Sequence, residues 1–462
     1  HVTGVQTCAL PISLIQRTGT KVGLVTTRGF EDTMIIARGP MGRNTGIPLE
    51  QALDFVRNEK PAPYVERRLT FGVGERLDLD GEVVAPLREE DVLAAAEALR
   101  AGGADSVAVS LLWSFRNPAH EERVRELLQA AVPGLDVSIS SEVSPVSGEF
   151  ERTMTTVVNA YLAPVMTRYI TQLAQGLAGD GLRYPVQLMT CGGGTIFPAD
   201  VARRAVSLIN GGPVGGLVAA RELGATLGVE NVITTDMGGT TFDVGLVHDL
   251  EPLRAATTIV HQYAFYVPAI DIKSIGAGGG SIAWVDDGGA LRVGPHSAGA
   301  VPGPVAFGRG GTEPTVTDAH IALGRLDAAE LSGGVALDRA AAVAAVAALA
   351  KQMKATTERT AEAIIAIADA AMARALRRVS VERGVDPRAC VLVGFGGGGP
   401  LHACALADLL GMRRILVPPH AGVLSALGLA IAPERREAAQ SVMRPAADLT
   451  KAEVARLHRA LA

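Results

Sequence analysis

The sequence predicts an α/β protein with parallel strands and covering helices. Between residues 89 and 140 the pattern alternates: a helix at 89–101, an apolar strand at 106–112, a helix at 118–131 and a strand at 137–140. Strands that alternate with helices in this way are typical of a parallel sheet, because parallel strands need a crossover connection. The chain has 462 residues, which is enough for two or three domains with separate cores.

The other segments extend this pattern along the chain. Before residue 89, a strand is expected at 21–26, an irregular proline-bearing stretch at 39–67, and a hairpin over 75–84 that turns at Asp80–Gly81. After residue 140, the patterns predict a long helix at 149–177, a strand at 186–190 that opens a second α/β unit, a helix after 210–216, a hairpin around 287–289, helices at 337–349 and 361–383, a strand at 390–393, and helices at 401–410 and 451–462.

The composition excludes several classes of protein. The net charge is −5, from 43 basic and 48 acidic residues, and no basic face or polybasic segment indicates binding to nucleic acid or to a membrane surface. The longest apolar tract, 415–432, contains Pro418 and Pro419, so we expect core elements there and no transmembrane span. Four scattered cysteines without C-x-x-C spacing argue against a disulfide framework or a zinc site, and a cytoplasmic protein is expected.

The stretch from Asn231 to Val247 carries the clearest functional pattern. An apolar run ends in Asp236, two glycines and two threonines follow, and a second apolar run begins at Phe242. Glycines let backbone N–H groups approach an anion closely, and threonine hydroxyls add donors. The stretch is therefore typical of a hairpin that holds a phosphate, although an ordinary glycine turn between two strands explains this motif alone equally well.

Two further glycine-rich loops follow the same order of strand, glycines, then hydroxyl or helix. They lie at 276–281 and 394–402. Glycine turns at the strand ends of α/β sheets are where ligands bind, and a helix N-terminus beside such a turn favours an anion. The three loops together predict a nucleotide site. A dinucleotide site is disfavoured, because no acidic residue about 20 positions after Gly394 ends a second strand.

Several motifs spread over residues 14–433 resemble those of one known family. They are Leu24-Val-Thr-Thr-Arg-Gly-Phe-Glu-Asp32, Glu151-Arg-Thr-Met-Thr-Thr-Val-Val-Asn-Ala-Tyr161, Asp236-Met-Gly-Gly-Thr240, Gly276-Ala-Gly-Gly-Gly-Ser-Ile-Ala-Trp-Val285, Gly308-Arg-Gly-Gly-Thr-Glu-Pro-Thr-Val-Thr-Asp318, and 396–403 with His402. In these motifs the chain resembles the A component of the hydantoinase and 5-oxoprolinase family. The resemblance implies the two-domain, actin-like ATPase fold of sugar kinases and heat-shock chaperones.

In that fold two phosphate hairpins face each other across a cleft, and a later glycine loop borders the adenosine. The resemblance implies that 236–243 is the second hairpin, and that the first lies before Leu14. We therefore expect a chain truncated at both ends, with these parts: residues 1–13 as a non-native junction, 14–180 as the rest of the first domain, 181–435 as the second domain, and 436–462 as the start of a C-terminal region. Without the first hairpin, weak or no ATP binding and no turnover are expected.

The resemblance and the local sequence patterns together suggest roles for individual residues. The residues expected to bind phosphate are Gly238, Gly239, Thr240 and Thr241, and those expected to border the adenosine are Gly396, Gly397, Gly398 and Gly399. Asp236 would hold Mg²⁺ or its waters, and Asp243 would either orient the nucleophile or simply end the hairpin. His402 would donate to an anion or pack as a helix-cap histidine. Asp271 and Asp318 could bind metal or cap loops.

The activity implied is ATP-dependent hydrolysis of a cyclic amide of the hydantoin or 5-oxoproline type, with ATP and Mg²⁺ as cofactors. ATP would phosphorylate the ring carbonyl, and a hydantoinase B-type subunit would complete a hetero-oligomer. Phe242 and the segment 212–216 look more like the nucleotide subunits of acetone and acetophenone carboxylases, so a ketone substrate is the alternative. His320, where Asn is usual, and the loop 299–307 also depart from the hydrolase pattern. A non-catalytic ATP switch is a more distant alternative.

Overall fold

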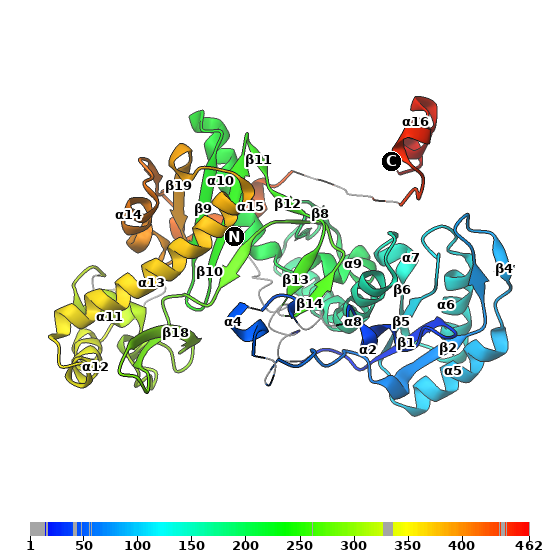
Figure 1. Ribbon diagram of the computed structural model, residues 1–462, viewed down its shortest axis with the longest axis horizontal. Coiled ribbons are helices and arrows are strands. Elements are labelled where there is room, and N and C mark those ends of the chain that lie inside the picture. The colour runs from blue at the N-terminus through cyan, green and yellow to red at the C-terminus, as the bar shows by residue number, and fades with distance from the viewer. Residues whose placement is uncertain are drawn as a thin grey trace. The chain divides into compact units, whose positions relative to one another are not determined.

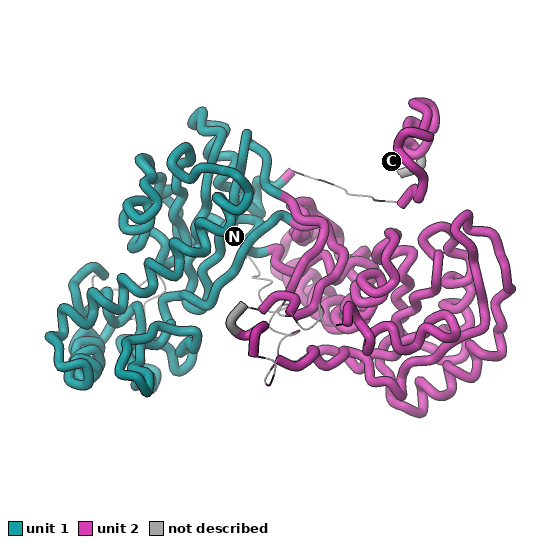
Figure 2. Tube along the Cα trace, viewed as in Figure 1, with its two compact units in different colours: residues 1–5, 212–253, 270–432 teal, residues 6–211, 254–269, 433–462 magenta. Residues whose placement is uncertain are grey.

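The computed structural model describes residues 14–461 apart from 15–16, 40–43, 48, 55, 57, 261, 327–335, 434, 436–438 and 440. The segment 1–13, which we interpreted as non-native, lies outside the described residues. Contacts divide the chain into two compact units (Figure 2). Of the described residues, unit 1 holds 212–253 and 270–432, and unit 2 holds the stretch up to 211, then 254–269 and the residues from 433 onward.

Unit 2 contains the parallel sheet that the sequence predicted (Figure 1). Its strand order is β2-β1-β5-β6, with β1 at Val22–Thr27, β2 at Thr70–Val73, β5 at Ser106–Ser110 and β6 at Asp136–Ile139. All three pairings are parallel; Leu24, for example, lies opposite both Thr70 and Ala108. The alternation of strand and helix therefore specified this sheet correctly.

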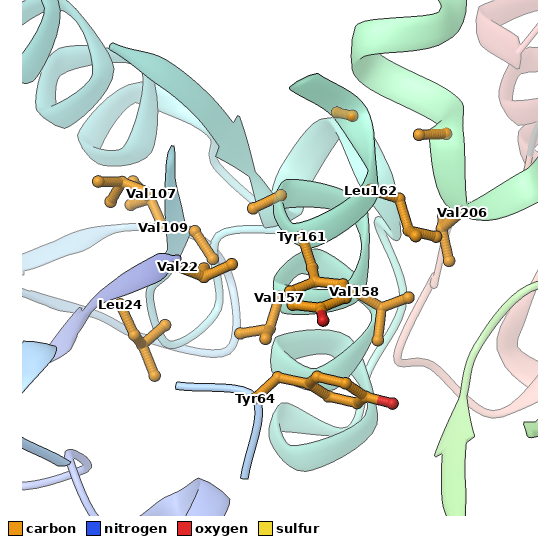
Figure 3. Close-up of a cluster of buried hydrophobic side chains, with 14 of the residues drawn as sticks. Val22, Leu24, Tyr64, Val107, Val109, Val157, Val158, Tyr161, Leu162 and Val206 are labelled. Carbon is orange, nitrogen blue, oxygen red and sulfur yellow. The ribbon is translucent and has the colours of Figure 1, made fainter. Parts of the chain in front are cut away.

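Long helices pack against this sheet and each other. They are α5 (Glu89–Ala101), α6 (Ala119–Ala131) and α8 (Glu149–Gly179). Residues 151–163 of α8 are buried on every side, which is typical of a helix inside a core. Figure 3 shows Val157, Val158, Tyr161 and Leu162 of α8 among buried valines of the sheet.

Shorter elements complete unit 2. They are α2 (Thr33–Ile36), α4 (Leu49–Ala52), the hairpin of β3 (Arg76–Leu77) and β4 (Val83–Ala85), α7 (Ser140–Val143), β7 (Leu188–Met189), β8 (Thr195–Ile196), α9 (Val201–Arg204), β12 (Arg254–Ala255), β13 (Thr258–Val260), β14 (Tyr263–Phe265) and α16 (Lys451–Leu461). The hairpin of β3 and β4 confirms the turn expected at Asp80–Gly81.

The boundary expected between residues 180 and 181 differs from this division. The strand expected at 186–190 does not open a second unit, because β7 pairs only with β8, antiparallel, in a two-stranded piece. Leu188, Ile196 and Ile209 belong to the same buried cluster as the parallel sheet. The segment 181–211 is therefore part of unit 2.

Unit 1 is built on a mixed sheet of order β11-β10-β9-β19-β20, with β16 also paired to β10. Its strands are β9 (Val232–Met237), β10 (Phe242–His248), β11 (Glu251–Pro252), β16 (Lys273–Ile275), β19 (Val391–Phe395) and β20 (Ile415–Leu416). β9 and β10 form the antiparallel hairpin that the sequence predicted, and β19 lies parallel to β9.

Helices and a second hairpin complete unit 1 (Figure 1). They are α10 (Gly211–Leu227), the hairpin of β17 (Ser281–Val285) and β18 (Leu291–Ser297), α11 (Val316–Ala322), α12 (Arg339–Gln352), α13 (Thr357–Ser380), α14 (Gly399–Leu410) and α15 (Leu424–Ile431); β15 (Ala269–Ile270) lies where the chain enters the unit. α13 packs against β10, α11 and α14. Within the described part of the chain, no helix is both long and apolar enough to cross a membrane.

Candidate functional site

The hairpin of β9 and β10 presents four exposed residues at its tip, 238–241. The Gly238 amide donates to the Thr241 carbonyl at 3.0 Å and closes the turn. Directly below the tip, Asp236 and Asp243 are paired across the two strands. Side chains opposite each other in a ladder lie on the same face, so two carboxylates stand beneath an exposed glycine-threonine turn.

The glycine loop 276–281 packs directly on this tip. The amides of Gly279 and Gly280 donate to the carbonyls of Gly238 and Gly239 at 3.0 and 2.7 Å. A Cβ on Gly278 would lie only 2.5 Å from the Thr240 amide nitrogen, so the approach requires glycine there.

The third glycine loop lies against the other side of Asp236 and Met237. The Gly398 amide donates to the Met237 carbonyl at 3.0 Å. Gly396 has φ +78°, and a Cβ there would overlap Oδ1 of Asp236. The structure therefore brings together the three loops that the sequence singled out, and they meet around residues 236–240.

Both carboxylates below the tip are partly buried and hydrogen-bonded by serines. Ser425 donates to Oδ2 of Asp236 at 3.2 Å, and Ser274 donates to Oδ1 of Asp243. Burial raises the pKa of Asp236, against the hydrogen bond from Ser425. Burial, with the nearby charge of Asp236, raises the pKa of Asp243 to about 6, against the hydrogen bond from Ser274. The charge of Asp236 thus disfavours ionisation of Asp243, a cost that a bound divalent cation would remove.

Sequence reasoning missed both serines. Ser425 reaches Asp236 because α10 and α15 pack with their backbones in close contact: a Cβ on Gly215 would lie 2.6 Å from the Ser425 carbonyl. The sequence feature that could have indicated this contact is the presence of Ser425 and Gly428 inside the apolar tract 415–432, which we interpreted only as core. Ser274 faces Asp243 through the pairing of β16 with β10, which no local pattern encodes.

Asp271 and Asp318 do not join Asp236. Asp271 is ion-paired with Arg383 and, at 3.1 Å, with Lys273. Asp318 is fully buried and caps α11: its carboxylate accepts from the amides of Thr315, Val305 and Ala306 and from the Thr315 hydroxyl. This geometry favours the loop-capping alternative for Asp318. Among the described residues, no group of three or more His, Cys, Asp and Glu side chains could hold a metal ion.

His402 is also enclosed. Its side chain is 1% exposed, and its two ring nitrogens face Asp369 at 2.5 Å and His320 at 3.1 Å. This geometry favours the packed alternative over direct contact with an anion. Phe242, on which the ketone alternative partly depended, is a fully buried core side chain.

A profile of the hydantoinase/oxoprolinase family matches residues 152–438, and a profile of the N-terminal region of the same family matches residues 6–132. The chain belongs to the hydantoinase/oxoprolinase family. The resemblance inferred from the motifs is thereby confirmed.

Individual relatives have different activities. The chain is 41% identical to the caprolactamase subunit alpha of Pseudomonas jessenii over 419 residues, which cover 90% of this chain and 59% of that protein. It is 40% identical to the acetophenone carboxylase gamma subunit of Aromatoleum aromaticum over 430 residues, which cover 90% and 58%. The chain spans about three fifths of the length of these relatives.

Solved structures confirm the mixed α/β fold. The crystal structure of the ATP-dependent caprolactamase from Pseudomonas jessenii matches with a TM-score of 0.77 and 40% identity, covering 92% of this chain and 61% of that one. The nucleotide-free structure of acetone carboxylase, described as catalysing ATP-dependent acetone carboxylation, matches with a TM-score of 0.79 and 32% identity, covering 92% and 60%.

Proposed function

We propose that this chain is the ATP-binding component of an ATP-dependent enzyme that activates a carbonyl group, with a cyclic amide as the substrate. The observation that supports the proposal most is the convergence of three glycine loops on the hairpin that carries Asp236 and Asp243. We further propose that the fold is of the actin-like ATPase type and that a B-type subunit completes a hetero-oligomer. The subunit names of the relatives support the second point.

The described residues fit ATP with Mg²⁺. The exposed turn 238–241 offers backbone N–H groups and two hydroxyls to phosphate oxygens. The loop 396–399, followed directly by the start of α14, would border the nucleoside. Asp236 would hold Mg²⁺ or its waters, because Mg²⁺ commonly uses one or two carboxylates together with phosphate oxygens. Bound there, Mg²⁺ would neutralise charge on the transferring phosphoryl group.

The reaction overcomes the low reactivity of an amide. The carbonyl oxygen of the ring attacks the γ-phosphorus of ATP, an O–P bond forms, and the bond to the leaving ADP breaks. Water then adds to the activated carbon, the ring C–N bond breaks and the nitrogen takes up a proton, which leaves an acyl phosphate. A second water hydrolyses the acyl phosphate to the carboxylate and free phosphate. The task of this chain is to place the γ-phosphate and stabilise its charge. Asp243, with a pKa of about 6, would accept a proton at neutral pH.

A ketone is the alternative substrate, in an ATP-dependent carboxylation. The similarity to the acetophenone carboxylase gamma subunit supports it almost as strongly as the similarity to the caprolactamase subunit supports an amide. Both reactions phosphorylate a carbonyl oxygen, so the same hairpin would serve either.

The test is ATP hydrolysis by the full-length protein together with its B-type subunit, assayed with 5-oxoproline, hydantoin, caprolactam and, with bicarbonate, acetone. We expect an amide to stimulate ATP hydrolysis, and Asp236→Asn to reduce it at least ~100-fold, about 2.7 kcal/mol of barrier. The matched control is Asp287→Asn, an exposed Asp in the other glycine-containing hairpin turn of unit 1, which should retain activity. Stimulation by acetone alone would favour carboxylation, and no stimulation by any substrate would contradict both enzymatic proposals.

A further inference from the structure

Three buried polar side chains form a chain of hydrogen bonds behind the glycine loops of unit 1. His402 Nδ1 lies 2.5 Å from Oδ1 of Asp369, and His402 Nε2 lies 3.1 Å from His320 Nε2. The exposed fractions are 1% for each histidine and 5% for Asp369. Desolvating such groups is costly, and apolar side chains could fill the same volume. The network therefore needs a role that packing alone does not supply.

The contacts fit one arrangement of the protons. When the Asp369 carboxylate accepts from Nδ1 of His402, Nε2 of a neutral His402 accepts from Nε2 of His320. Burial, together with the neighbouring His402, lowers the pKa of His320 to about 3, so His320 is neutral and carries a single ring proton. His320 Nδ1 has no hydrogen-bond partner among the described residues. A bare lone pair there is more favourable than a buried N–H without an acceptor, which is rarer in proteins.

Each histidine lies on a helix that is connected to one of two glycine loops. His402 lies in the first turn of α14, directly after the loop 396–399. His320 lies on α11, one turn after Thr317, whose amide and hydroxyl both donate to the Gly279 carbonyl at 2.8 Å. The rings also pack edge to face, with centroids 4.7 Å apart. The contact between the histidines thus joins α14, which follows the loop 396–399, to α11, which is hydrogen-bonded to the loop 276–281 through Thr317.

We propose that Asp369, His402 and His320 are positioning residues that hold the glycine loops 276–281 and 396–399 at a fixed separation around the hairpin tip. The consequence for nucleotide binding rests on the proposed function: the phosphate and nucleoside contacts form as one preorganised site. The coupling between the loops is a property of the ligand-free chain. It can therefore be tested without ATP.

The test compares two substitutions of His320 by hydrogen exchange of the ligand-free, full-length protein. His320→Leu removes the N–H donor at similar size, and His320→Gln places an amide donor near the position of Nε2. We expect His320→Leu to speed exchange at least ~10-fold in both loops, including 396–399, which His320 does not contact through any recorded hydrogen bond. His320→Gln should restore protection. The control is Ser380→Ala on α13, which removes a buried hydroxyl bonded to the Leu376 carbonyl of its own helix.

Unchanged exchange in 396–399 for a folded His320→Leu protein, or equal changes in His320→Leu and Ser380→Ala, would overturn the proposal. If His320→Leu does not fold, imidazole ¹⁵N NMR of the wild-type protein supplies an independent test. We expect protons on Nδ1 of His402 and Nε2 of His320, and bare Nε2 and Nδ1 respectively. A His320 protonated on Nδ1 alone would contradict the network.

Nucleotide measurements then separate this proposal from the proposed function. We expect His320→Leu to raise the Kd for Mg·ATP about tenfold, with a smaller change in kcat, and His320→Gln to restore the affinity. If wild-type protein binds no ATP, the proposed function fails, whereas the exchange results in the ligand-free protein still decide whether the network positions the loops.

Discussion

Replacing Asp243 by Asn should raise the free energy of unfolding of unit 1 at neutral pH, and this gain should disappear as the pH is lowered to about 4. The pKa of Asp243 rises from an ordinary 3.8 to about 6, mainly through burial. At about 1.4 kcal/mol per pKa unit, the ionised carboxylate costs roughly 3 kcal/mol of folding free energy above pH 6. A carboxyl group with a raised pKa binds more protons in the folded state, so the wild-type protein loses this stability as the pH rises from about 4 to about 6. Asparagine is neutral throughout, so the variant loses none.

The assay is urea denaturation at pH 4, 6 and 8, with unit 1 reported by Trp284 on β17. The chain contains two tryptophans, so a Trp113→Phe background leaves Trp284 as the single tryptophan signal. We expect Asp243→Asn to be more stable than the parent by up to about 3 kcal/mol at pH 8 and by about zero at pH 4.

The control, Asp286→Asn, should show the opposite sign. The hydrogen bond from the Ala290 amide is the largest cause that lowers the pKa of Asp286, so this variant should be destabilised at pH 8 and equal to the parent once both states are protonated. A gain for Asp243→Asn that is independent of pH, or a loss at pH 8, would refute the reasoning about the two carboxylates.

Three further predictions concern nucleotide use by the full-length protein with its B-type subunit. Gly278→Ala should weaken Mg·ATP binding at least ~10-fold, about 1.4 kcal/mol, because a Cβ at this position would lie 2.5 Å from the Thr240 amide nitrogen. The control, Gly276→Ala, should bind Mg·ATP normally, because the atom nearest to its Cβ is a carbonyl oxygen at 3.5 Å. Equal affinities of the two variants would show that the loop does not shape the site. The kcat/KM for ATP hydrolysis should rise with pH up to about 6 and then level, since Asp243 acts when ionised; a flat profile between pH 5 and 8 would exclude it as the base. Ser425→Ala removes a hydrogen bond that lowers the pKa of Asp236. The Mg²⁺ concentration that gives half-maximal ATPase activity should therefore increase several-fold in a Mg²⁺ titration. An unchanged half-maximal concentration would mean that Ser425 does not support a metal ligand.

Local sequence patterns specified the elements well where one face or one turn dominates. Helix α5 begins and ends at Glu89 and Ala101 as predicted, because its apolar spacing and following glycines are local signals. The hairpin at 231–247 and the parallel strands of unit 2 were also predicted correctly. The glycine loops could be grouped into one site because each follows a strand, and strand ends are where α/β proteins bind ligands.

Features that depend on contacts distant in sequence could not be predicted. Ser425 meets Asp236 across 189 positions, and His402 meets His320 across 82. The segment 181–211 follows a long helix and resembles a new unit, yet its apolar side chains fill the core of unit 2. Asp318 follows a glycine-rich segment, as a metal-binding carboxylate could. Its carboxylate instead accepts hydrogen bonds from backbone amides, and these depend on the fold of the 305–315 loop.

The central claim is that three glycine loops form one site for the phosphates and nucleoside of ATP. Hydrogen exchange of the full-length protein, with and without saturating Mg·ATP, tests it most directly. We predict slower exchange in all three segments, 238–241, 276–281 and 396–399, and no such effect of Mg·ATP in Asp236→Asn. Protection confined to other parts of the chain, or no protection in these segments at saturating Mg·ATP, would contradict the claim.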